Sequence, residues 1–212
     1  MKAAILERNE VNSSQAKTKY MVELALMVAI TLLMALTPLG YLKTPGLSVT
    51  LLTIPVAIAA MLLGPVGGAI CGTAFGLTSF ANGFTGTFAP LIPLNPVGFF
   101  IMTVVARMLE GLVTGFVFKA MRKSQAASKA SFFVASLCCP LLNTLFFMSS
   151  LVVFFYNTDL IQNFVNMLGV TNPITFVVAF VGVQGAIEAA VCCIVATAVS
   201  TTLYAVFRKN QQ

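Results

Sequence analysis

Six long apolar runs, separated by charged residues or turn residues, are the feature of this sequence that most restricts its fold. A transmembrane helix needs about 20 mostly apolar residues, within a range of about 17–25. Each run therefore predicts one helical crossing, the second short and interrupted by Pro55, the last long enough to emerge into the membrane interface. The runs cover residues 20–39, 47–63, 65–82, 97–118, 131–156 and 174–205. We expect an all-α membrane protein with six transmembrane helices.

The composition agrees with a chain that is solvated by lipid. Hydrophobic residues make up 58% of the 212 residues and charged residues 8%, whereas ordinary globular domains have about 45–50% apolar and about 25% charged residues. The mean hydropathy is +0.96. A soluble protein needs many more charges on its surface. The composition therefore excludes soluble enzymes, nucleic-acid-binding modules and disordered tails.

Basic residues give the chain its net charge of +6, and their placement predicts its orientation. Six crossings put both termini and the 119–130 loop on one side of the membrane. Because ten of the twelve basic residues lie in these three segments, the positive-inside rule identifies that side as cytoplasmic. The ten residues are Lys2, Arg8, Lys17, Lys19, Lys119, Arg122, Lys123, Lys129, Arg208 and Lys209.

This orientation predicts the organisation of the chain. We expect a cytoplasmic tail over residues 1–19, one transmembrane domain over 20–207 and a cytoplasmic tail over 208–212, with the protein in the cell membrane. No small-residue cleavage site follows the first apolar run, so we interpret that run as a retained helix and not as a signal peptide.

Several kinds of chemistry are excluded by residues that the chain lacks. Without histidine there is no Ser-His or Cys-His nucleophile system and no histidine-based metal site. Without a Gly-rich Walker-type loop the chain does not hydrolyse ATP by that route. The five cysteines lie inside apolar runs without C-x-x-C spacing, so we interpret them as packing residues. We expect no metal and no cofactor.

Charged residues inside the apolar runs are informative, because burying one costs about 2.5–3.5 kcal/mol on insertion scales. Arg107 and Glu110 are three residues apart, so they share a helix face and can pair with each other. In a second interpretation, Arg107 faces a cavity and binds the anion of a ligand, while Glu110 or Glu188 balances its charge when no ligand is bound. The sequence leaves both interpretations open.

A layer of polar residues is predicted near the middle of the membrane. With a rise of about 1.5 Å per residue, Arg107 and Gln184 lie about 15 Å below the outer surface, and Asn143 lies about 18 Å from the inner one. This column of polar groups fits a solute-binding pocket that narrows inward. Interhelical hydrogen bonds that stabilise the bundle are the alternative. Further candidates lie at the outer end, on or beside the outer loops: Lys43, Asn82, Thr85, Thr87 and Asn95.

Small residues recur at helical spacing in two of the runs. Ala25 and Ala29 form an A-x-x-x-A element, and Gly68, Gly72 and Gly76 repeat every four residues. Such faces let helix backbones approach closely in lipid. We expect the glycines to pack inside the bundle, and for the two alanines docking onto another membrane protein is an alternative to internal packing.

Residues 48–115 carry motifs of one known family. The motifs are Thr50 and Thr53 followed by Ile54-Pro55-Val56, then Leu62-Leu63-Gly64-Pro65, Phe75-Gly76-Leu77-Thr78-Ser79, Phe88-Ala89-Pro90-Leu91-Ile92-Pro93 and Ala106-Arg107-Met108-Leu109-Glu110-Gly111-Leu112. This pattern resembles the substrate-binding (S) components of energy-coupling factor (ECF) vitamin transporters.

The resemblance implies an S-component-like bundle that binds one water-soluble vitamin from the outside. It also implies two kinds of partner, a transmembrane coupling (T) subunit and two cytoplasmic ATPases, with Ala25 and Ala29 lining the docking face for the coupling subunit. The pattern is most similar to the pantothenate-type members, although Thr53 stands where that group often has histidine. Riboflavin and folate members are alternatives.

The chemistry of the candidate residues is compatible with pantothenate. Arg107 and Lys43 suit a substrate carboxylate, and Asn, Gln and Thr side chains suit hydroxyls and an amide. Two other classes of function are also considered. One is an intramembrane enzyme that uses Arg107, Glu110 and Glu188, for which no nucleophile with a base partner is evident. The other is a self-sufficient carrier or channel, against which the lack of an inverted repeat argues.

Overall fold

The computed structural model describes residues 2–38, 40–44, 47–124, 127–128 and 130–209, and of these it describes only the backbone for 2–13, 42–44, 47–49, 183 and 207–209. The described chain is helical apart from one short hairpin. In chain order its elements are α1 Lys2–Leu36, β1 Tyr41–Thr44, β2 Leu47–Thr50, α2 Thr53–Leu62, α3 Gly64–Gly83, the 3-10 turn η1 Ala89–Leu91, α4 Pro96–Phe100, the π-helical turn η2 Ile101–Val105, α5 Ala106–Lys123, α6 Ser131–Phe155, α7 Asp159–Met167 and α8 Pro173–Lys209.

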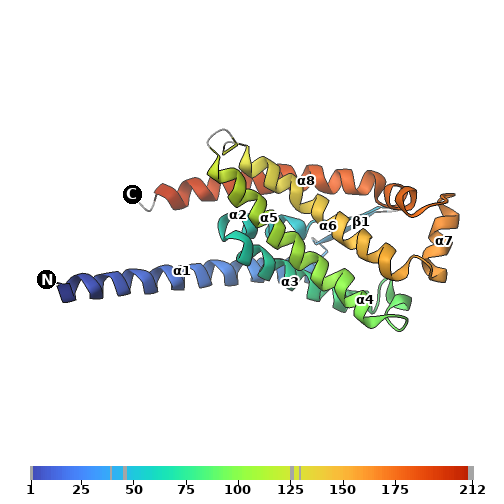
Figure 1. Cartoon of the computed structure of the whole chain (residues 1–212), viewed down its shortest axis with the longest axis horizontal. Helices are drawn as coiled ribbons and strands as arrows, with labels where there is room; N and C mark the ends of the chain where they lie inside the picture. The colour runs from blue at the N-terminus through green and yellow to red at the C-terminus, as the bar shows by residue number, and fades with distance from the viewer. Residues whose placement is uncertain (1, 39, 45–46, 125–126, 129, 210–212) are drawn as a thin grey trace.

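Among the described residues, four helical segments are long and apolar enough to cross a membrane: Ser14–Leu36, Pro96–Lys123, Ser131–Phe155 and Gln184–Val206. Two shorter apolar helices, Thr53–Leu62 and Pro173–Gly182, accompany them. The protein is therefore a helical membrane protein. Figure 1 shows an elongated bundle, with the start of α1, the end of α8 and the α5–α6 junction at one end. The helix α7 and the junction between α3 and α4 lie at the other end.

The expectation of one helix over residues 47–63 is wrong at its start. Residues 47–50 form β2, which pairs antiparallel with β1, and the helix that follows has only ten residues. The physical reason is visible in the sequence, because Leu47 and Val49 alternate with Ser48 and Thr50, a period of two that is typical of a strand. The hairpin brings a loop between α1 and α2 into the body of the protein.

The run over 174–205 is also interrupted. The helix α8 extends from Pro173 to Lys209, but inside it Gly182 has φ 32° and ψ −125°, which is not helical. Glycine adopts such a positive φ without the steric cost that other residues meet. The kink divides α8 into a first part, which ends at Gly182, and a second part of membrane-spanning length.

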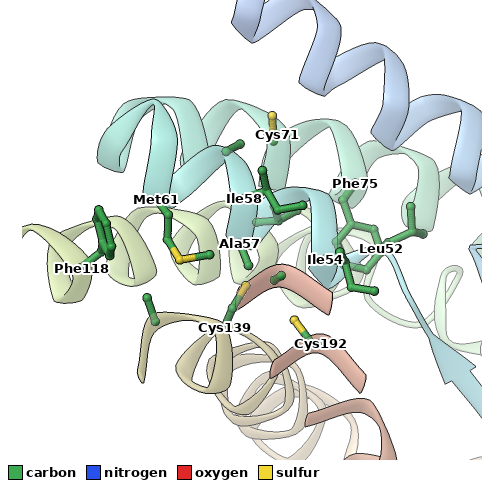
Figure 2. Packing of buried hydrophobic residues seen from close by; sticks show 14 of the residues in the cluster. Leu52, Ile54, Ala57, Ile58, Met61, Cys71, Phe75, Phe118, Cys139 and Cys192 are labelled. Atoms are coloured by element: carbon green, nitrogen blue, oxygen red, sulfur yellow. The ribbon is translucent and has the colours of Figure 1, made fainter. Parts of the chain in front are cut away.

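The centre of the bundle is α2, whose residues from Thr53 to Met61 are all buried. Figure 2 shows its side chains, such as Ile58 and Met61, surrounded by residues from α3, α5, α6 and α8, including Phe75 and Cys139. A helix that is apolar all round lies either in lipid or in a buried core, and α2 lies in the core because neighbouring helices cover it. This explains how so short a helix holds its place in the bundle.

The packing of α3 against α5 is close enough to exclude side chains. A Cβ atom on Gly76 would lie 2.7 Å from the Cα of Val104, and one on Gly72 would overlap the carbonyl oxygen of Arg107. The expectation that these glycines pack inside the bundle is confirmed. Because Gly72 and Gly76 have no side chains, η2 and the first turn of α5 can lie in direct contact with the backbone of α3.

Candidate functional site

A cavity of about 850 Å³ lies between the end of α1, β1, α3, the α3–α4 connection, η2, the start of α5 and α6. Its volume falls within the range of about 300–1,000 Å³ that is usual for small-molecule sites. Polar and aromatic residues share its wall, which consists of Thr37, Pro38, Tyr41, Ser79, Asn82, Gly83, Thr85, Gly86, Thr87, Phe88, Phe99, Met102, Thr103, Arg107 and Phe147.

Among the described residues of this wall, Arg107 is the charged one, and it is only 9% exposed. Its Nη1 donates hydrogen bonds to the carbonyl oxygens of Met102 (3.2 Å) and Thr103 (3.1 Å). Both carbonyls belong to the π-helical turn η2, directly before α5. Such turns occur often at functional sites, and here the turn supplies two acceptors that orient the guanidinium without neutralising its charge.

Two aromatic rings complete the surroundings of this guanidinium. The Arg107 Cζ atom lies 4.7 Å from the centroid of the Phe75 ring and 5.1 Å from that of Phe147. Cation–π contacts of this kind stabilise a cation that has lost much of its water. They leave the ligand-binding capacity of the guanidinium available, because the rings accept no conventional hydrogen bond.

The pairing of Arg107 with Glu110, one of the two interpretations that the sequence leaves open, is not seen. Within the described part of the chain, no carboxylate lies within 4.0 Å of the Arg107 nitrogens, and Nε has no hydrogen-bond partner. Glu110 is fully buried, and its Oε1 accepts a hydrogen bond from the Cys139 thiol at 3.1 Å. Glu188 is 6% exposed and accepts a hydrogen bond from the backbone N–H of Thr50. Both acids therefore bond to groups other than Arg107.

The predicted polar residues of the outer end divide into two groups. Asn82, Thr85 and Thr87 line the cavity. Asn95 does not line it; its Oδ1 accepts a hydrogen bond from the Gly98 N–H at 2.8 Å and caps α4. Asparagine directly before a helix is a preferred capping residue, and this local bond explains its position.

Of the remaining candidates, Asn143 and Gln184 are not among the residues that line the cavity. Asn143 is buried on α6, and its Oδ1 has no hydrogen-bond partner among the described residues. It lies one turn before Phe147, which does line the cavity. Gln184 is half-buried on α8. Lys43 belongs to β1, but its side chain lies outside the described part of the structure.

With this geometry described, the comparison with known families is informative. Residues 19–200 match the model of the family described as "ECF transporter, substrate-specific component". The chain belongs to this family. As an ECF S component it is a membrane transport protein.

One curated relative of this ECF S component is the pantothenate transporter PanT of Leuconostoc mesenteroides subsp. mesenteroides. The two are 38% identical over 112 residues, which cover 50% of this chain and 53% of the relative. The match thus spans about half the length of that relative.

The aromatic part of the wall was not among the residues that the sequence singled out for this ECF S component. Tyr41, Phe88, Phe99 and Phe147 line the cavity, and the Tyr41 hydroxyl lies 3.1 Å from the Oγ of Ser79. Ser79 and Phe88 lie within the family motifs, which was the available signal for both. Tyr41 and Phe147 carry no comparable pattern, since their place depends on the hairpin and on the rotation of α6.

The predicted docking residues lie on a separate surface. Ala25 and Ala29 are exposed on α1 of the ECF S component, beside large exposed side chains such as Val22 and Leu26.

Within the described part of the chain, no three Cys, Asp or Glu side chains group in a way that could hold a metal ion.

Proposed function

We propose that this ECF S component binds pantothenate from the outer side of the bacterial cell membrane. The observation that carries the proposal is the Arg107 guanidinium, which lies in the cavity wall without a carboxylate partner among the described residues. A buried cation of this kind is costly in a membrane protein unless an anion reaches it. The carboxylate of pantothenate is such an anion, and the similarity to a pantothenate transporter supports the choice.

The rest of the cavity wall complements the remainder of pantothenate. Its secondary amide and two hydroxyls need donors and acceptors, which Asn82, Thr85 and Thr87 provide on one side of the cavity. Its gem-dimethyl group is apolar and suits the rings of Phe88 and Phe147. Asn95, Asn143, Gln184 and Lys43 remain candidates that could approach the solute after a rearrangement, and a solute carboxylate would have a second cation in Lys43.

A riboflavin-type solute is the second candidate, because a specific observation favours it. Tyr41, Phe88, Phe99 and Phe147 give the cavity four aromatic rings, and flat heteroaromatic solutes stack on such rings. Folate combines an aromatic ring system with carboxylates, so it is a candidate for the same aromatic rings. These candidates differ from pantothenate in the groups that they require, so competition experiments separate them.

We further propose the assembly and orientation that the family implies. Six crossings over residues 20–207, with both terminal tails in the cytoplasm, are supported by the shared end of the bundle to which α1 and α8 extend (Figure 1). The exposed Ala25 and Ala29 allow close approach of a transmembrane coupling subunit. Two ATPases that bind this coupling subunit would supply ATP hydrolysis, while Glu110 and Glu188 contribute negative charge near Arg107.

The deciding experiment is solute binding by the purified chain in lipid nanodiscs. Titration calorimetry with pantothenate, riboflavin and folate should show tight binding of pantothenate alone, and native mass spectrometry should detect pantothenate that is carried through purification. Arg107→Met should abolish most of this affinity, and Arg107→Lys should restore part of it. Binding of riboflavin in preference to pantothenate would refute the assignment.

A second assay separates the S component from a self-sufficient carrier. Vesicles that contain only this chain should bind labelled pantothenate without accumulating it. Vesicles that also contain the coupling subunit and the ATPases should accumulate it when ATP is present. Accumulation by the isolated chain would contradict the proposed division of labour.

A further inference from the structure

Glu188 makes a hydrogen bond that connects two distant parts of the chain. Its Oε1 accepts the backbone N–H of Thr50, the last residue of β2, at 2.5 Å, and the two residues are 138 positions apart in the sequence. Glu188 is 6% exposed and lies on the second part of α8, after the kink at Gly182. A charged acceptor makes a stronger hydrogen bond than a neutral one.

The position of the β1–β2 hairpin depends on such contacts. A two-stranded hairpin alone is marginally stable, so contacts with the helices must hold it. The described structure provides contacts at the base of the hairpin: Leu51 N–H donates to the Gly40 carbonyl at 3.0 Å, and the Tyr41 hydroxyl lies 3.1 Å from Ser79 Oγ on α3. The bond to Glu188 is a hydrogen bond to α8, which also packs against β2.

The strand register transmits this contact to the cavity. Thr50 is the direct antiparallel partner of Tyr41, and Tyr41 lines the cavity. A displacement of Thr50 from α8 therefore displaces Tyr41 as well. We infer that Glu188 is a positioning residue, which holds the end of β2 against α8 and thereby keeps Tyr41 in the cavity wall.

This role differs from balancing the charge of Arg107, and the two roles predict different results for the same pair of variants. In Glu188→Gln the side-chain oxygen can still accept the Thr50 N–H, but the negative charge is lost. In Glu188→Ala both are lost. If Glu188 positions the hairpin, the position of β2 and the solute binding of the glutamine variant stay close to those of the wild type. If Glu188 balances the charge of Arg107, the two variants are equally defective in solute binding.

Hydrogen exchange of the Thr50 amide tests the inference without any solute. Deuterium uptake should be followed by mass spectrometry in peptides that cover residues 50–52, in nanodiscs, for the wild type and for Glu188→Gln, Glu188→Ala and Thr197→Val. Thr197 is on the same helix, and its Oγ1 has no hydrogen-bond partner among the described residues, so its variant is the matched control. We expect exchange to be at least about tenfold faster in Glu188→Ala. A hydrogen bond to a charged group shifts the equilibrium between the closed and the open state of the amide by about one to two orders of magnitude.

In the same experiment Glu188→Gln should lie closer to the wild type than to Glu188→Ala, and Thr197→Val should match the wild type. Equal uptake in the wild type and Glu188→Ala, or equal acceleration in both Glu188 variants, would overturn the inference. If Glu188→Ala does not fold, the glutamine variant decides the result: wild-type-like exchange supports the inference, and fast exchange overturns it.

The consequence for solute binding rests on the proposed function. With Tyr41 displaced, pantothenate should dissociate about tenfold faster from Glu188→Ala, with an intermediate rate for Glu188→Gln. The failures of the two proposals are distinguishable. A wild-type chain that does not bind pantothenate refutes the proposed function, while the exchange of the Thr50 amide still decides the role of Glu188.

Discussion

Replacement of Gly76 by alanine should displace the turn that orients Arg107. A Cβ atom at this position would lie 2.7 Å from Val104 Cα, 2.9 Å from the Thr103 carbonyl oxygen and 3.1 Å from the Val104 carbonyl oxygen. All three atoms are backbone atoms of η2, so no side-chain rotation relieves the overlap. Ordinary carbon contacts are about 3.5–4.0 Å long, and η2 must therefore move away from α3 by about 1 Å.

This displacement has two measurable consequences. Overpacking of a close interface costs about 1–3 kcal/mol of stability. Because the carbonyl of Thr103 accepts a hydrogen bond from Arg107, the guanidinium moves together with the turn. A misplacement of about 1 Å can reduce the function of a preorganised site by about 100-fold, so we expect a loss of solute affinity between about tenfold and 100-fold.

The assay needs a control that lowers stability without touching η2. Leu77→Gly is suitable, because Leu77 is 52% exposed on the outward side of α3 and glycine inside a helix costs about 1 kcal/mol. Melting temperatures can be measured with a thiol-reactive dye, since buried cysteines such as Cys71 and Cys139 become reactive only on unfolding. Affinity follows from titration calorimetry with pantothenate. Unchanged affinity in Gly76→Ala, or an equal loss in Leu77→Gly, would refute the reasoning.

Three further predictions follow from the site and from α1. Arg107→Met should weaken pantothenate binding by about 10- to 100-fold while Arg107→Lys retains more of it, measured by calorimetry; equal affinities in all three proteins would exclude Arg107 as a solute contact. Replacing both Ala25 and Ala29 with leucine should leave binding intact but impair ATP-driven uptake in vesicles with the partner subunits, and full uptake would contradict the docking role. Tyr41→Phe removes the hydroxyl next to Ser79 and should reduce stability by about 1 kcal/mol, seen as a lower melting temperature; an unchanged melting temperature would show that this hydroxyl contributes nothing.

Much of the architecture could be predicted from one-dimensional patterns. Apolar runs of spanning length predicted membrane helices, and the structure contains such helices that overlap the runs 20–39, 97–118, 131–156 and 174–205. The family was also recognisable from short motifs, since residues 19–200 match its model. The hairpin was missed, because Leu47–Thr50 was joined to the apolar residues of α2 although its own alternation has the period of a strand.

The site was predictable only in part. Arg107, Asn82 and Thr85 line one cavity. Counting helical rise gave the depth of Arg107, because depth in the membrane is proportional to residue number along a helix. Asn82 and Thr85 were chosen for their place at an outer loop, and their contact with a solute stays a prediction. Counting does not give the rotation of a helix about its axis. Asn143 and Gln184 therefore reach a similar depth without lining the cavity, and Asn95 satisfies a local bond with Gly98 instead.

By itself the amino-acid sequence determined that this chain is solvated by lipid, that it is helical and which family it belongs to, because these properties depend on residue type and on spacing along the chain. Tertiary structure alone decided which groups Glu110 and Glu188 contact and which rings surround Arg107. A carboxyl beside a thiol, a carboxylate on a strand amide and a guanidinium between two phenylalanine rings arise from the packing of α3, α5, α6, α8 and the hairpin, because these partners are far apart in the sequence.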